Sequence, residues 1–161
     1  MNKEEFAGVV LAATDSLYRV SHAVLRSDTD CEDAVQEAIA IAFEKLYTLK
    51  QDEYAKTWLT RILIHECYHI QKRRKQTVCL QEDNPEFSYH QNDYLDLYQA
   101  VMGLSEQHRL VVILHHLEGY SVEEVAKMLR VPQGTVKSRL SRAREQLKKD
   151  LEEEAYEFCR L

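Results

Sequence analysis

Glycine and proline are scarce in this sequence, and their scarcity limits the folds that the chain can adopt. Only four glycines and two prolines occur among its 161 residues. A β-sandwich or β-barrel needs many tight turns, and these two residue types are prominent in such turns. The hydrophobic content of 45% is sufficient for a core. We therefore expect an all-α fold.

The segment 76–93 separates two parts of the chain. It is polar, contains the dipeptide Asn84-Pro85 and lacks a sustained helical period. These properties are typical of a linker. We expect one small helical domain over residues 1–75, a flexible acidic linker over 76–93, and a second small helical domain over 94–161 that ends in an acidic tail.

The net charge of −6 conceals an uneven distribution of charged residues. No lysine or arginine lies between positions 76 and 108, whereas basic clusters occur at 72–75 and across 130–149. Electrostatic potential decays over about 8–10 Å at cellular salt. Local clusters therefore matter more for phosphate binding than the mean charge does, and two basic patches make this acidic chain compatible with DNA binding.

The sequence HECYH at residues 65–69 matches H-E-x-x-H, the zinc signature of many metallopeptidases. Such an enzyme needs a third protein ligand and an open coordination position. The extended motif would require glycine and histidine where Lys72 and Lys75 stand. The shorter motif could still take Glu86 or His90 as its third ligand.

The motif lies within residues 57–75, whose pattern predicts one long helix. Its apolar residues share one face, with His65 and His69 at the edge of that face. An aromatic and basic set occupies the opposite side and suits base stacking and phosphate contact. This set is Arg61, Tyr68, Lys72 and Lys75. A nucleic-acid-binding helix is therefore favoured, and a zinc peptidase that uses His65, Glu66 and His69 is the remote alternative.

The rest of the first half also has helical spacing, and we expect four helices there in all. One of them begins near residue 28, where Asp28 or Asp30 would be its N-cap. In the second half, a helix over 105–117 would begin at Ser105 and end at Gly119 in a left-handed conformation. Its expected apolar face is Leu110, Val111, Ile113, Leu114 and Leu117.

Residues 121–149 have the pattern of a helix-turn-helix. Ser121 caps a first helix, RVPQG interrupts the chain, and a second helix begins near Gln133 or Gly134. The inward stripe of the second helix is Val136, Leu140, Ala143 and Leu147. Opposite this stripe project Thr135, Lys137, Ser138, Ser141 and Arg142. Such a helix enters the major groove of DNA; the alternative is an ordinary helical hairpin with a solvated basic face.

Three segments of the chain resemble regions of the bacterial sigma factors, particularly of the small extracytoplasmic-function (ECF) type, and they occur in the same order as in those factors. LSEQHRLVVILHHLEGYSVEEVAKMLRVPQGTVKSRLSRAREQLKK resembles their fourth region, which binds the promoter. DCEDAVQEAIAIAFEKLY resembles their second region, and YAKTWLTRILIHECYHIQKRRK resembles its melting-and-recognition segment. The resemblance implies an initiation factor with no enzymatic activity, cofactor or metal that directs core RNA polymerase to promoter DNA. A stand-alone helix-turn-helix regulator is the alternative.

The resemblance also implies roles for individual residues. The residues that would face the clamp helices of core polymerase are Asp33, Gln36 and Glu37. Those assigned to the minus-ten element are Leu49, Lys50, Trp58, Arg61, His65, Lys72, Arg73 and Arg74. Those assigned to the minus-thirty-five element are Thr135, Lys137, Ser138, Arg139, Ser141 and Arg142. Helix 105–117 would pack on the polymerase flap.

Further expectations concern location and regulation. No apolar run approaches the roughly 20 residues needed to span a bilayer, and the N-terminus has acidic residues before its apolar stretch, unlike a secretory signal. We therefore expect a cytoplasmic protein without direct membrane insertion. Related factors are often held by an anti-sigma factor, which the resemblance makes a candidate partner. Relatives commonly have Asn where His65 stands, and this difference leaves the preferred base open.

Overall fold

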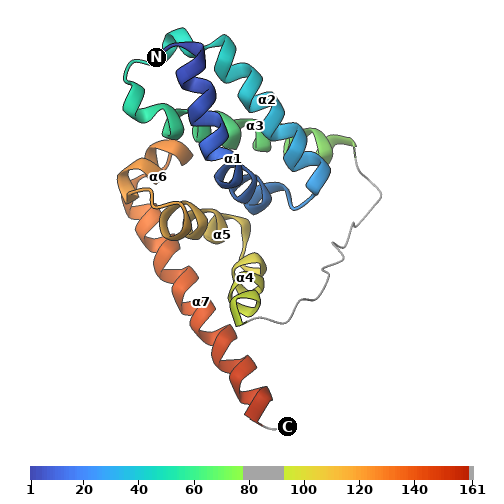
Figure 1. Ribbon diagram of the computed structural model, residues 1–161. Helices are drawn as coiled ribbons and strands as arrows, with labels where there is room; N and C mark the ends of the chain where they lie inside the picture. Colours follow the sequence, from blue (N-terminus) through green and yellow to red (C-terminus); the bar gives the residue numbers. More distant parts are fainter. Residues whose placement is uncertain (78–92, 160–161) are drawn as a thin grey trace. The chain divides into compact units, whose positions relative to one another are not determined.

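The computed structural model describes residues 1–77 and 93–159, and every regular element within these ranges is a helix (Figure 1). The chain divides into two compact units, Met1–Pro85 and Glu86–Leu161. The predicted all-α fold with two helical domains is thus confirmed. Most of the expected linker 76–93, with the alternative ligands Glu86 and His90, lies outside the described residues.

The first unit is a bundle of three α-helices, α1 (Lys3–Leu25), α2 (Asp28–Glu44) and α3 (Ala55–Thr77), each packed against the other two. The expectation of four helices is wrong because α1 is continuous. Its buried positions recur at helical spacing along the whole of Lys3–Leu25, so no polar break interrupts it. The core includes Phe6, Leu17, Val20, Leu59 and Leu63, each fully buried.

An aromatic cluster connects the three helices of this unit. The Phe6 ring of α1 meets the Phe43 ring of α2 edge to face, with centroids 5.0 Å apart. It meets the indole of Trp58 in α3 in the same way at 5.9 Å. Aromatic pairs in this arrangement contribute about 0.5–1.5 kcal/mol beyond their buried area. Phe6 therefore packs the C-terminal end of α2 and the N-terminal end of α3 against α1.

The start of α2 differs from the sequence expectation. Its N-cap is Ser27, whose hydroxyl accepts from the Asp30 backbone N–H at 3.5 Å, and neither Asp28 nor Asp30 has this role. Both aspartates lie instead in the first turn, where the helix dipole favours negative charge. The Asp30 side chain turns inward and is used in tertiary packing.

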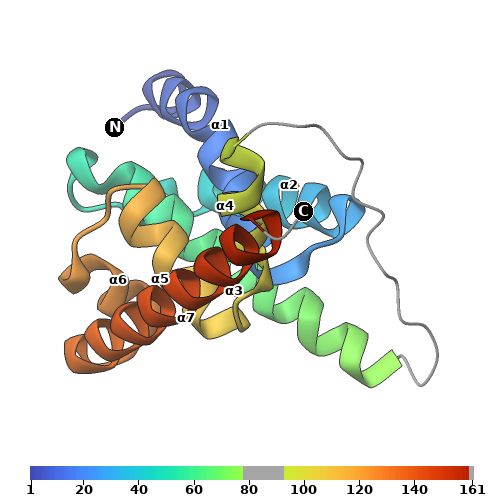
Figure 2. The ribbon, with the colours of Figure 1, turned by 90° about the horizontal axis from the view of Figure 1, so that it is seen from below.

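The second unit contains α4 (Asp93–Gly103), α5 (Glu106–Val112), α6 (Val122–Leu129) and α7 (Gln133–Cys159). The helix of α5 continues as a π-helical turn over Ile113–Leu117. Helices α4, α5 and α6 all pack against α7, which Figure 2 shows running past α5 and α6. Helix α7 also extends through the acidic tail to Cys159. The fully buried core includes Leu110, Val111, Leu114, Val125 and Val136.

Two features of α5 were predicted with unequal success. Gly119 follows the helix with a φ of 77°, which confirms its left-handed conformation. Leu117 is 52% exposed and does not belong to the buried face. The π-helical turn changes the angular spacing of side chains, so a period of 3.6 residues misplaces this last position.

A buried arginine joins α5 to α4. Arg109 is 3% exposed, and its Nη1 donates to the carbonyl oxygens of Met102 at 2.9 Å and Leu104 at 3.4 Å. Carbonyls at a helix end have no partner within the helix. The guanidinium therefore satisfies acceptors at the end of α4, a role that the sequence pattern did not indicate.

Candidate nucleic-acid interface

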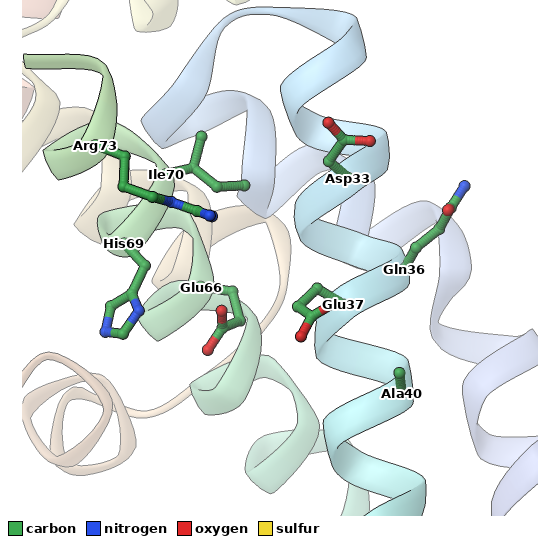
Figure 3. Close-up of a pocket in the computed structure, with 8 residues that line it drawn as sticks. All are labelled: Asp33, Gln36, Glu37, Ala40, Glu66, His69, Ile70 and Arg73. Atoms are coloured by element: carbon green, nitrogen blue, oxygen red, sulfur yellow. The ribbon is translucent and has the colours of Figure 1, made fainter. Parts of the chain in front are cut away.

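The predicted polymerase-binding residues lie in one groove of the first unit. Asp33, Gln36 and Glu37 are exposed on α2. Together with residues of α3 they line a groove of about 750 Å³ (Figure 3). The α3 wall is Glu66, His69, Ile70 and Arg73. The structure thus brings the α2 set together with two of the three defining residues of the H-E-x-x-H motif, a juxtaposition that the sequence did not predict.

The charge of this groove is negative. Its lining residues include three carboxylates, those of Asp33, Glu37 and Glu66, and one guanidinium, that of Arg73. Two of the carboxylates come from α2 and one from α3. The carboxylates outnumber the guanidinium, so the surface favours a positively charged occupant even though Arg73 belongs to the basic stretch 72–75.

The segment between α2 and α3 holds the predicted base-binding loop. It has two short 3-10 turns, Leu46–Thr48 and Asp52–Tyr54. Leu49 is half-buried and Lys50 is exposed between them. Tyr47, which is not among the predicted residues, lies beside this loop and is 86% exposed. Its position between Lys45 and Lys50 is the feature of the sequence that would have singled it out.

The predicted minus-ten residues of α3 are of two kinds. Arg61, His65, Lys72 and Arg73 are exposed. Trp58 is half-buried and packs on Phe6, as described above.

Arg74 is also partly engaged within the protein. Its Nε lies 2.6 Å from Asp30 Oδ2. This oxygen is buried and makes no hydrogen bond within the described residues, so the ion pair is what offsets the burial of its charge. The pair fastens the C-terminal part of α3 to the first turn of α2.

The H-E-x-x-H motif adopts the expected helical arrangement. His65 Nδ1 lies 3.2 Å from Glu66 Oε1, and the rings of His65 and His69 have centroids 4.2 Å apart. Within the motif, Cys67 points into the core and is fully buried. Among the described residues, no histidine, cysteine or acid joins the three as a further metal ligand.

The second unit has the predicted helix-turn-helix. Ser121 and Glu124 form a capping box at the start of α6, with bonds of 3.2 Å and 2.8 Å. Arg130 ends α6 in the left-handed region, with a φ of 55°. The Thr135 N–H then donates to the Pro132 carbonyl oxygen at 3.0 Å, which begins α7 at Gln133 as predicted. The left-handed arginine was not anticipated, because glycine is the usual residue there.

Helix α7 separates its core residues from its candidate DNA-binding residues. Val136, Leu140 and Ala143 are buried, which confirms most of the inward stripe, while Leu147 is only half-buried. The exposed members of the predicted set are Lys137, Ser138, Ser141 and Arg142, and the half-buried members are Thr135 and Arg139. Ser138 Oγ donates to the Thr135 carbonyl oxygen at 3.0 Å, which keeps this side chain close to the helix.

Comparison with known proteins decides the family. The models for Sigma-70 region 2 and Sigma-70, region 4 match residues 10–77 and 94–147. The chain is 31% identical over 135 residues to the ECF RNA polymerase sigma factor SigM of Mycobacterium tuberculosis, an alignment that covers 81% of this chain and 69% of SigM. The chain belongs to the ECF sigma factors. It is therefore a non-enzymatic initiation factor that binds core RNA polymerase and directs promoter-specific transcription.

Other sigma factors resemble the chain over most of its length. The RNA polymerase sigma-E factor of Streptomyces antibioticus is 31% identical over 153 residues, which cover 92% of this chain and 85% of that factor. The sigma factor RpoE of Bartonella quintana, solved with the anti-sigma factor NepR, superimposes with a TM-score of 0.76 and 28% identity. That alignment covers 92% of this chain and 98% of RpoE.

Matches to both regions do not favour the stand-alone regulator or the zinc peptidase. No helix in the described ranges combines the length and the apolar character that crossing a bilayer requires.

Proposed function

We propose that this sigma factor recognises the minus-thirty-five element with the N-terminal half of α7. Support comes from one observation above all. Lys137 and Arg142 are exposed on the face opposite the buried stripe, and within the described part of the chain neither side chain makes a hydrogen bond or an ion pair. The proposed set is Thr135, Lys137, Ser138, Arg139, Ser141 and Arg142.

The composition of this face suits the major groove. Small residues such as Gly134, Ser138 and Ser141 keep the bulk of the helix low and allow its backbone to approach the base edges. Arginine and lysine then reach guanine edges or phosphates, and a good bidentate base contact contributes about 1–3 kcal/mol of discrimination.

The minus-ten element is assigned to the other unit. We propose that Leu49 and Lys50 receive an unpaired base and that Arg61, His65, Lys72 and Arg73 contact the strand. Extracting a base costs a few kcal/mol, so a pocket and cations are both needed. Trp58 and Arg74, which pack on Phe6 and Asp30, are proposed mainly as supports that orient these exposed residues.

Core polymerase is assigned to two surfaces. The exposed face of α2 with Asp33, Gln36 and Glu37 would bind the clamp helices. Residues 105–117 would meet the flap, where the exposed Leu117 offers an apolar contact. Two modest DNA contacts joined by a linker gain effective concentration once both units are held on polymerase.

Reconstituted run-off transcription with core polymerase on genomic promoter fragments tests the proposal. The factor is expected to give discrete transcripts only with core polymerase, and promoter binding by the holoenzyme is expected to fall steeply as salt rises. Glu37→Lys is expected to abolish polymerase association, whereas Glu32→Lys, also exposed in α2 but absent from the groove lining, is the matched control. Equal losses for both variants would refute the assignment to α2.

Location and regulation complete the proposal. We propose that the factor acts in the cytoplasm, together with RNA polymerase. The RpoE of Bartonella quintana was solved with an anti-sigma factor, and we propose a partner of this kind here. A tagged chain recovered from its own cells is expected to carry a protein that, once isolated, displaces core polymerase. A partner that leaves polymerase bound would contradict this role.

A further inference from the structure

We propose that His65, Glu66 and His69 bind a divalent transition-metal ion on the α3 wall of the groove between α2 and α3. Metal binding is a property beyond polymerase and promoter binding, although His65 belongs to the proposed minus-ten set and the groove is shared with Asp33 and Glu37. It involves no peptide hydrolysis. Its ligand atoms all lie within 4.8 Å of one another. The imidazoles stand one helical turn apart on α3, the arrangement in which two histidines can bind one ion.

His65 and Glu66, which are joined by a hydrogen bond, also have about the spacing that such an ion requires. Zn–N and Zn–O bonds of about 2.0–2.2 Å in a tetrahedral site put neighbouring ligand atoms roughly 3.3–3.5 Å apart. His65 Nδ1 and Glu66 Oε1 are separated by 3.2 Å, close to that spacing. A ring nitrogen of His69 would complete three ligands after a small side-chain rotation, which its exposed position permits.

The local charge also favours a cation. Three carboxylates and one guanidinium line the groove. Figure 3 shows Glu37 of α2 turned toward Glu66 of α3, so a carboxylate from the opposite wall faces the site. Arg73, from the basic stretch that follows the motif, is the guanidinium in this lining, and the carboxylates outnumber it. Water would take the fourth position.

The ligand chemistry selects the class of ion. Imidazole nitrogens suit Zn²⁺, Ni²⁺, Cu²⁺ and Co²⁺, while Mg²⁺ and Ca²⁺ prefer oxygen ligands. The side chain of Glu66 is 12% exposed, which lets the carboxylate keep its position, whereas that of His65 is 59% exposed and open to an ion from solvent. Zn²⁺ is the probe of choice because it favours a tetrahedral set and is redox-inert.

Calorimetric titration of the tag-free full chain with ZnCl₂ tests the site. One equivalent of Zn²⁺ is expected to bind, and MgCl₂ is expected to give no heat. His69→Gln is expected to weaken Zn²⁺ binding by more than about tenfold, since even outer partners of a metal site contribute about 10–100-fold. His108→Gln in the other unit is the matched control and should leave the affinity unchanged.

Two further measurements keep the test decisive. Imidazole NMR signals of His65 and His69 should shift on Zn²⁺ addition, and far-UV circular dichroism should show that His69→Gln is folded. If cysteine thiols bind a second equivalent of Zn²⁺, that equivalent should disappear in a chain carrying Cys79→Ser and Cys159→Ser. Absence of Zn²⁺ binding, or binding that survives His69→Gln and disappears with these serines, would overturn the proposal.

The position of the site implies a link to polymerase, and this consequence rests on the proposed role of α2. Zn²⁺ would neutralise charge in the groove that Asp33 and Glu37 line. Zn²⁺ is therefore expected to weaken polymerase association for the natural sequence and not for His69→Gln. Intact Zn²⁺ binding without this effect would refute the link and leave the metal site standing. Failure of Glu37→Lys to affect polymerase association would instead count against the proposed function.

Discussion

The basic surfaces of the two units differ in how far they are committed to the fold. In α3, Arg74 is ion-paired with the buried Asp30, and the half-buried Trp58 packs on Phe6. In α7, Lys137 and Arg142 project away from a stripe of buried residues. On α3, residues that stabilise the fold thus lie among the candidate DNA-binding residues. On α7, the two kinds of residue lie on opposite faces. Substitutions of Trp58 or Arg74 in α3 are expected to alter stability and DNA binding together. Substitutions of Lys137 or Arg142 in α7 are expected to alter DNA binding alone.

Charge reversal in α7 should give the largest effect. Arg142→Glu removes a proposed base or phosphate contact and adds repulsion, so promoter-specific transcription is expected to fall by about 100-fold or more. Association with core polymerase should be retained. Run-off transcription and polymerase capture measure the two effects. Lys148→Glu, on the same helix outside the predicted set, should retain transcription; loss of polymerase binding by Arg142→Glu would contradict the assignment of α7.

Truncation of the tryptophan should give the largest loss of stability. Trp58→Ala removes the ring that meets Phe6, and because the indole is half-buried we expect a loss of about 2–4 kcal/mol in the free energy of unfolding of the first unit. Urea titration followed by far-UV circular dichroism measures this change. Trp58→Phe should recover most of it. Unchanged stability with lost promoter opening would show that the indole contacts DNA directly.

Removal of the α3 ion pair should have a smaller effect. Arg74→Ala leaves the buried Asp30 oxygen without its cation, and we expect a loss of about 1–2 kcal/mol, between the values for exposed and buried pairs. Fluorescence of Trp58, the single tryptophan, follows urea unfolding of this unit alone. Lys75→Ala, at the exposed neighbouring position, is the control. Equal stability of the two variants would mean that Arg74 is available for DNA.

The cap of α6 should give the smallest effect. Ser121→Ala removes the acceptor for the Glu124 N–H and is expected to cost about 1 kcal/mol in the second unit. Circular dichroism in urea should detect this loss, while Trp58 fluorescence should not shift. Promoter preference should also remain unchanged, because the cap lies outside the proposed DNA-binding face. A changed preference would show that support and recognition are coupled in α7 as well.

Much of the helix-turn-helix could be predicted because its determinants are local. Ser121 with Glu124 specifies a helix start, and the spacing of Val136, Leu140 and Ala143 specifies a buried stripe. Two predictions of local features nevertheless failed, because a serine one residue earlier takes the cap of α2 and a π-helical turn interrupts the 3.6-residue period after α5. Ser27 caps α2 in place of Asp28 or Asp30, and the π-helical turn exposes Leu117.

The helical class, the division into two units and the outward face of α7 follow from the order of residues, because each depends on periodicity, caps and turn residues close together in the chain. The ion pair of Arg74 with Asp30, and the groove that Glu66 and His69 share with Asp33 and Glu37, arise from the packing of helices. These pairings join α2 to α3 across a loop. Helical periodicity gives the side of a helix on which a residue lies, but the packing angle and register between helices decide which residue it meets.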